Sequence, residues 1–256
     1  MINFFRKKRK ILADENQIVK YTRYAIGEIV LVVIGILIAL QINNNNETRK
    51  TREKELHYLT NIKSDLQLNI NEIQDYIDIR TARIVSANKV IEHFEGKPLT
   101  NLDDFNSDIV NIYTWRKFYQ INNTFQELTN SGNLALISND SIKNTLLNIE
   151  TLYKKLKYEE EHFRYDAEVM LYGPSYKILD LNPVVKKYTY KVSNGQAGEN
   201  IDLPRANFEL MLTDLEQKNG FVMASYEFSF MNGQLEGMKS ICKDLIEIID
   251  KEIKQN

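Results

Sequence analysis

Helical spacing brings three metal-binding residue types together in the segment EEEHFRYD. Glu159, His162 and Asp166 lie three and seven residues apart, so an α-helix places them on one face. Glu-x-x-His is also the spacing with which helical bundles hold pairs of carboxylate-bound metal ions. Such sites need the motif twice together with two further glutamates, and the chain has no second Glu-x-x-His. We therefore expect a solvated helix face here, with neither a metal ion nor a cofactor.

No nucleophile motif stands out either. Ser131 precedes Gly132 in the segment TNSGNLALISND, but the local pattern predicts a helix ended by the glycine and a new helix capped by Ser138 or Asn139. The chain lacks G-x-S-x-G, a glycine-rich phosphate loop and H-E-x-x-H, and Cys242 is its single cysteine. We therefore expect a protein without catalytic residues that is not an enzyme.

The N-terminal end of the chain is basic. Residues 1–24 hold seven Lys/Arg against Asp14 and Glu15, although the whole chain has a net charge of -2. Five of these basic residues form one cluster, which consists of Arg6, Lys7, Lys8, Arg9 and Lys10. Because an apolar run follows, we expect this cluster to contact a membrane surface rather than nucleic acid.

That apolar run extends from Tyr24 to Ile42, and only Glu28 and Gln41 within it are strongly polar. With a rise of ~1.5 Å per residue, a helix of this length extends about 28 Å, close to the roughly 30 Å of a hydrocarbon core. No A-x-A-like cleavage site follows, so we favour an uncleaved membrane anchor over a removed signal peptide. The excess of basic residues before the run predicts a cytoplasmic N-terminus.

Glu28 interrupts this run and shares a helix face with Val32, Gly35 and Ala39, each within about 40° of it. Small residues let helices approach closely in lipid, and intramembrane acids usually face a protein partner. One interpretation is a helix–helix contact, with a second copy of the chain or with another membrane protein. The alternative is that Glu28, which lies near the basic end of the run, interacts with lipid headgroups.

The whole sequence predicts an all-α fold with four parts. Residues 1–23 form a cytoplasmic basic segment and residues 24–42 a single N-terminal transmembrane helix. This helix continues through a polar stalk, residues 43–55, which has no large apolar side chain. Residues 56–256 then form an extracytoplasmic bundle of long antiparallel helices.

Heptad spacing predicts the first long helix of the bundle, which ends before Gly96 and Pro98. Its polar exceptions are Lys63 and Arg80, and polar seam residues often set the register between helices. The two heptad positions are occupied by Leu56, Lys63, Ile70, Ile77, Ile84 and Ile91, and by Leu59, Leu66, Ile73, Arg80, Ala87 and Phe94.

Two further long helices have matching patterns. The helix at residues 140–171 carries apolar residues at alternating spacings of four and three, broken by Glu160, and we expect it to stop at the Gly-Pro pair of residues 173–174. The helix at residues 221–253 carries the same repeat and includes Cys242 as a buried, inert seam residue. The first long helix is expected to pack against both.

Shorter helices are predicted at residues 101–113, 124–131 and 206–219. The second of these is expected to begin with a capping box, Thr124 and Glu127, and to end at Gly132. The third is expected to end at the Asn-Gly pair of residues 219–220.

Residues 172–205 form an irregular insertion that holds three of the four prolines. Within it, the alternating segment KKYTYKV predicts a short strand. Because long loops are often functional, this insertion is our first candidate for contacts away from the membrane, with a variable surface segment as the alternative.

The segments MINFFRKKRK, YAIGEIVLVVIGILIALQINNNNE and TFQELTNSGNLALISNDSIKN resemble an uncharacterised family of Bacteroidota proteins, classed as a domain of unknown function. The resemblance covers essentially the whole chain and is most specific in the membrane run with Gly27 and Glu28. Family members often carry a tryptophan in the asparagine run, where this chain has Asn45. The resemblance implies a single-pass membrane protein with a helical extracytoplasmic domain, and it implies no activity. From all these features we expect a location in the inner (cytoplasmic) membrane with a periplasmic C-terminal domain.

Together these features predict a membrane-anchored, non-catalytic interaction or scaffold protein. Its partners would be the lipid bilayer and either a membrane protein or a second copy, through the transmembrane helix. The alternative is a periplasmic ligand-sensing domain that signals through a membrane partner. A sensor requires Lys63 and Arg80 to converge on a ligand, whereas a scaffold requires them to be paired within the bundle or to reach water.

Overall fold

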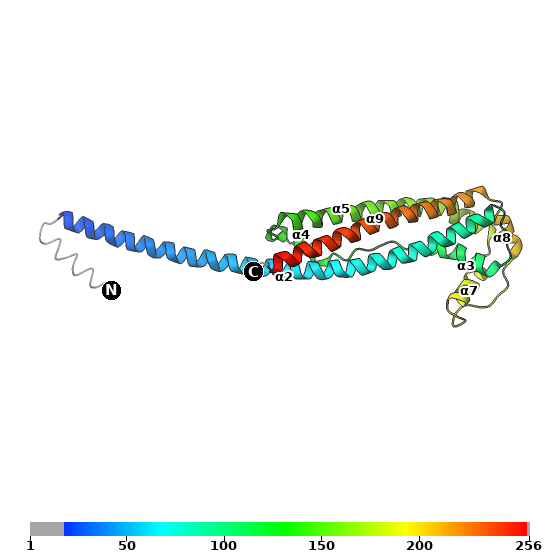
Figure 1. Ribbon diagram of the computed structural model, residues 1–256, viewed down its shortest axis with the longest axis horizontal. Coiled ribbons are helices and arrows are strands. Elements are labelled where there is room, and N and C mark those ends of the chain that lie inside the picture. Colours follow the sequence, from blue (N-terminus) through cyan, green and yellow to red (C-terminus); the bar gives the residue numbers. More distant parts are fainter. Residues whose placement is uncertain (1–17, 255–256) are drawn as a thin grey trace. The chain divides into compact units, whose positions relative to one another are not determined.

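A computed structural model describes residues 18–254 of the chain (Figure 1). Within these residues every element is helical and no strand occurs, so the predicted all-α class is confirmed. The chain divides into two units, Met1–His57 and Tyr58–Asn256. The cluster Arg6, Lys7, Lys8, Arg9 and Lys10 lies outside the described residues.

The first described element is the long helix α2, Ile18–Phe94, which continues without a break through the predicted membrane run and stalk. Gly96, with a φ of 103°, follows its end as predicted. The remaining elements are α3 (Leu102–Tyr113), α4 (Asn123–Asn130), the 3₁₀ turn η1 (Asn133–Leu136), α5 (Asp140–Asp166), the π-helical turn η2 (Ala167–Tyr172), α6 (Gly173–Ile178), α7 (Leu181–Val192), α8 (Arg205–Met211) and α9 (Leu215–Lys254).

In the first unit, α2 presents its apolar side chains outward. Among the described residues, α2 is the one helix long and apolar enough to cross a membrane, with a mean hydropathy of 2.6 over an 18-residue window and none of that window buried. The stalk is helical too, with local polar pairs such as Arg49–Glu53, and Asn45 pairs with Gln41 at the end of the membrane run. Such i,i+4 pairs add a few tenths of a kcal/mol each, about 0.2–0.5.

In the second unit, α9 runs antiparallel to α2 and α5 lies beside both (Figure 1). The α2–α9 register is marked by polar pairs that step seven residues up one helix and seven down the other. These pairs are Gln74–Lys239, Thr81–Asn232, Asn88–Ser225 and Glu95–Lys218. The predicted long antiparallel helices are therefore present and in a fixed register.

The buried face of α2 is wider than two heptad positions. The predicted position that contains Leu59, Ile73 and Arg80 is buried up to Ala87, whereas the position that contains Lys63 is half-buried except at Ile77. A third position, which includes Asn69, is covered instead. The Asn69 amide donates to the Ile121 carbonyl and accepts from the Ile121 N–H, which lies 2.7 Å away. The segment between α3 and α4 therefore buries a side of α2 that the two predicted heptad positions do not include.

The predicted strand KKYTYKV is wrong, because this segment forms the C-terminal part of α7. Asp180 caps α7 by accepting from the Asn182 N–H at 3.0 Å, and Pro183 sits in the first turn, where its missing N–H costs little. Asn194 and Gly195, with φ of 51° and 82°, end the helix. The insertion 172–205 is therefore largely helical up to this turn, and residues 193–204 remain irregular.

Three predicted helix boundaries are also wrong. The chain does not leave the helical path at the Gly-Pro pair 173–174, since α5 is followed directly by η2 and then by α6. Pro174 is tolerated because it lies in the first turn of α6. The helix predicted at 206–219 is split between α8 and α9, and Gly220 lies inside α9. The Thr124–Glu127 capping box does not form, since the Thr124 N–H donates to Asp65 Oδ2 at 2.9 Å instead.

Candidate functional site

The candidate membrane face lies entirely on α2. Glu28, Val32, Gly35 and Ala39 are all helical, so they share one face as the sequence predicts. Val32 is 58% exposed, and a Cβ added at Gly35 meets no described atom within 4 Å. Nothing within the described chain therefore requires a residue as small as glycine at position 35.

A buried ion pair joins the two residues that interrupt the predicted seams. Arg80 on α2 contacts Glu160 on α5, with side chains 3% and 0% exposed. Glu160 also accepts from the Phe118 N–H at 2.7 Å and from Lys157 Nζ at 3.1 Å. The Tyr76 ring lies 5.9 Å from the Arg80 guanidinium carbon. The cluster thus fastens α2, α5 and the segment before α4 at one point.

Two effects act in opposite directions on the pKa of Arg80 in this cluster. Burial lowers the pKa of the Arg80 guanidinium, while the Glu160 carboxylate acts against that shift. Because a buried charge is tolerated only when paired, Arg80 and Glu160 depend on each other. The pair therefore holds these two side chains together between α2 and α5.

Lys63, the other polar seam residue, pairs with a different partner. Its Nζ donates to Asp250 Oδ1 on α9 at 2.5 Å, and both side chains are about one-third exposed. Lys63 and Arg80 therefore do not converge on a common point. Both are paired within the bundle, as the scaffold hypothesis requires.

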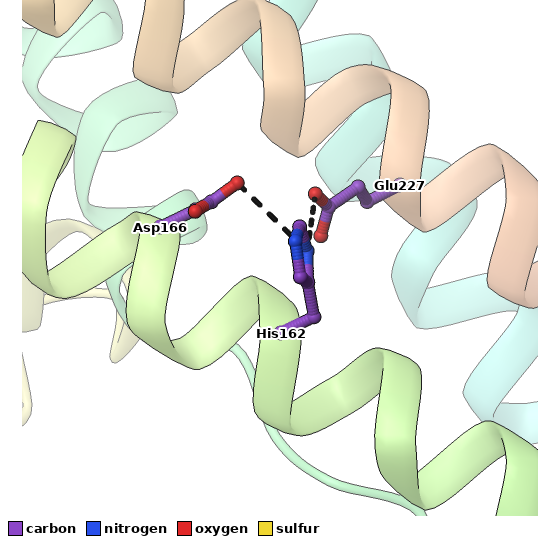
Figure 2. Close-up of side chains that lie close together, drawn as sticks. All are labelled: His162, Asp166 and Glu227. Atoms are coloured by element: carbon purple, nitrogen blue, oxygen red, sulfur yellow. Dashed lines mark hydrogen bonds and ion pairs between the residues drawn. The ribbon is translucent and has the colours of Figure 1, made fainter.

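A third polar cluster joins α5 to α9 at the protein surface (Figure 2). His162 Nδ1 lies 3.2 Å from Glu227 Oε1 and 3.9 Å from Asp166 Oδ2. Figure 2 shows both carboxylates turned toward the imidazole. His162 and Asp166 share a face as predicted, but Glu159 is not part of the cluster, and Glu227 from α9 completes it.

The three members of this cluster differ in their exposure. The His162 side chain is 53% exposed, whereas Glu227 is 9% exposed and its Oε2 is fully buried. Burial raises the pKa of Glu227, His162 lowers it and the Asp166 carboxylate raises it further. Sequence reasoning missed Glu227, and its one signal was its position next to Phe228, at the edge of the predicted α9 seam.

A polar hollow of about 430 Å³ lies where the end of α2 meets α3 and α7. Lys89, His93 and Asp108 line it, together with Lys191 from the predicted insertion. The Lys191 ammonium pairs with Asp104 across this hollow. The insertion therefore contributes to a concave polar surface, which favours a ligand-binding role.

The remaining chemical candidates have structural roles. The Ser131 hydroxyl donates to the Glu127 carbonyl at 2.7 Å in the last turn of α4, and Gly132 follows with a φ of 71°. Asn139 caps α5 as predicted, by accepting from Ser141 and Ile142. Cys242 is 1% exposed, and burial raises the pKa of its thiol to about 12. A thiol with so high a pKa is a poor nucleophile.

Comparison with known proteins identifies a family. Neither the curated proteins nor the solved structures contain a match to this chain. The model of a family of unknown function (DUF6090) matches residues 28–196, more than half of the 256 residues. The match begins at Glu28 in the apolar run and extends past the end of α7. The chain therefore belongs to this family of unknown function.

Proposed function

We propose that this chain is a membrane-anchored, non-catalytic interaction or scaffold protein. The observation that carries the proposal is the apolar window of α2, none of which is buried against the described chain. Contiguous apolar surface of this extent on a protein is normally covered by a membrane or a partner. A bilayer covers it most completely, since the helix satisfies its own backbone hydrogen bonds.

The proposed location is the inner (cytoplasmic) membrane, with one pass, a cytoplasmic N-terminus and a periplasmic C-terminal domain. The excess of basic residues before the apolar run supports this orientation. The cluster Arg6, Lys7, Lys8, Arg9 and Lys10 would then lie at the anionic cytoplasmic leaflet.

The proposed contact surface is the membrane face formed by Glu28, Val32, Gly35 and Ala39, and its partner is another transmembrane helix. Glycine at position 35 is unexplained by packing within the described chain, whereas close approach of a second helix would require it. The pairing of Lys63 with Asp250 and of Arg80 with Glu160 supports a bundle that acts as a scaffold.

Photocrosslinking within native membranes tests this contact. A photoreactive residue replaces Val32 on the proposed face, and Ile34, about 120° away from Glu28 around the helix, is the matched control. We expect Val32 to form a defined product and Ile34 to form little. Mass spectrometry then distinguishes a second copy from another membrane protein. Equal yields from the two positions would show that the face is covered by lipid alone.

A periplasmic ligand sensor is the second candidate. The polar hollow near Lys191 supports it, because a concave surface with several converging polar groups can bind a small ligand. It ranks below the scaffold because Lys63 and Arg80, the residues expected to meet a ligand between the long helices, are paired with separate acids.

A further inference from the structure

We infer that His162, Asp166 and Glu227 bind a divalent transition-metal ion that links α5 to α9. Each residue offers one ligand atom, and the three atoms lie within 4.8 Å of one another. Ligand atoms around a tetrahedral zinc ion are about 3.3 Å apart, given metal–ligand bonds of about 2.0–2.1 Å. The observed separations of 3.2 and 3.9 Å from His162 Nδ1 to the two carboxylates need only small side-chain shifts to reach that geometry.

An independent observation concerns Glu227, which is 9% exposed and points into the cluster (Figure 2). Its Oε1 contacts His162, but its buried Oε2 has no hydrogen-bond partner among the described residues. A buried carboxylate oxygen without a partner is costly, by about 1–3 kcal/mol or more. The Asp166 carboxylate, whose ligand atom lies within 4.8 Å of those of Glu227 and His162, adds repulsion between like charges. A cation between the two carboxylates would remove both costs.

The donor set selects the kind of metal. One imidazole nitrogen with two carboxylates suits Zn²⁺ or Mn²⁺, whereas Mg²⁺ and Ca²⁺ prefer oxygen ligands alone. Three protein ligands leave at least one position for water, and the half-exposed His162 lies at the solvent side. The π-helical turn η2 begins at Ala167, directly after Asp166, and such turns often occur at functional sites.

The competing interpretation is a hydrogen-bonded cluster without metal, in which His162 Nδ1 contacts Glu227 and a proton is shared between Glu227 and Asp166. Both arrangements place the same side chains together, but only one of them takes up metal. The replacements His162→Gln and Glu227→Gln separate them, because each keeps a polar side chain of similar size and removes one ligand. His57→Gln is the matched control, since His57 is exposed on α2 and lies outside the cluster.

Calorimetric titration of Zn²⁺ into the full-length chain in detergent, purified without a histidine tag, is the direct test. We expect one saturable site in the wild type and in His57→Gln, and binding weakened by more than about tenfold in the other two variants. Circular dichroism of each metal-free variant confirms that it is folded. Visible absorption of bound Co²⁺ reports ligand geometry and should be lost with His162→Gln. No saturable Zn²⁺ binding in the wild type, or equal binding by His162→Gln, overturns the site.

Discussion

Glu160 is the acceptor at the centre of the buried ion pair between α2 and α5. It accepts hydrogen bonds from Arg80, from Lys157 and from the Phe118 N–H, and it is completely buried. A buried ion pair of this kind contributes less to net stability than to specificity, because desolvation offsets the attraction between the charges. Its role is therefore to allow a single alignment of α2, α5 and the segment before α4.

Replacement of Glu160 by methionine should destabilise the bundle by about 3–5 kcal/mol, because Arg80 is left buried without its partner. The double replacement Arg80→Met with Glu160→Met should recover most of this loss. It should not recover all, since the Phe118 N–H still lacks an acceptor, which costs about 1–3 kcal/mol. Urea unfolding, followed by fluorescence of the single Trp115 packed on Phe163, measures both variants.

The control for this measurement is an exposed pair on the same helix system. Arg164 and Glu168 are 44% and 52% exposed, so Glu168→Met should cost less than about 1 kcal/mol. A Glu160→Met chain as stable as the wild type would contradict the assigned role of Glu160.

At the scale of single elements, Gly220 shows how α9 approaches η2. A Cβ at this position would lie 2.5 Å from Leu171 Cδ2 and 2.8 Å from its Cγ, and Leu171 is itself 1% exposed. The glycine therefore permits close contact between two helical elements instead of ending one.

Gly220→Ala should lower the free energy of unfolding by up to about 2 kcal/mol, because crowding against Leu171 outweighs the gain in helix propensity. Gly237→Ala on the same helix is the matched control. An added Cβ there meets nothing within 4 Å, so this change should stabilise the chain by about 0.5–1 kcal/mol. Thermal unfolding of the two variants side by side checks the difference in sign, and equal shifts would show that the contact at Gly220 is loose.

The long helices were predictable because a buried stripe repeated over several heptads leaves a periodic signal in the sequence. The role of Gly220 was not predictable, because the sequence alone does not distinguish a glycine that ends a helix from one that permits close packing of a second helix. The contacts Arg80–Glu160 and His162–Glu227 were also beyond reach, because they depend on the register of helices far apart in the chain. The sequence indicated Arg80 and Glu160 as exceptions to the apolar repeats and His162 by its Glu-x-x-His spacing, without their partners on other helices.

At the scale of the whole molecule, the proposed orientation can be tested with the chain's own chemistry. Cys242 is buried and its pKa is raised to about 12, so the native cysteine should not react with maleimides in the folded protein. A cysteine introduced at the exposed position Gln196 then reports one side of the membrane, and one at Asn3 reports the other.

In spheroplasts, a membrane-impermeant maleimide should label Gln196→Cys at once and label Asn3→Cys only after lysis. This outcome follows from a cytoplasmic basic segment and an exported bundle. The opposite pattern would reverse the orientation. Labelling of both only after lysis would place the whole chain inside the cell.

The antiparallel register of α2 and α9 has a consequence for synthesis of the protein. Among the described helices α9 is translated last, yet it covers α2 residues such as Ile77 and Thr81. At roughly 5–20 residues per second, the ribosome needs on the order of ten seconds to pass from Phe94 to Lys254. During that interval the apolar stripe of α2 is not yet covered by α9. A chain stopped before α9 would keep the stripe open to chaperones and proteases, so its lifetime in the cell would be short.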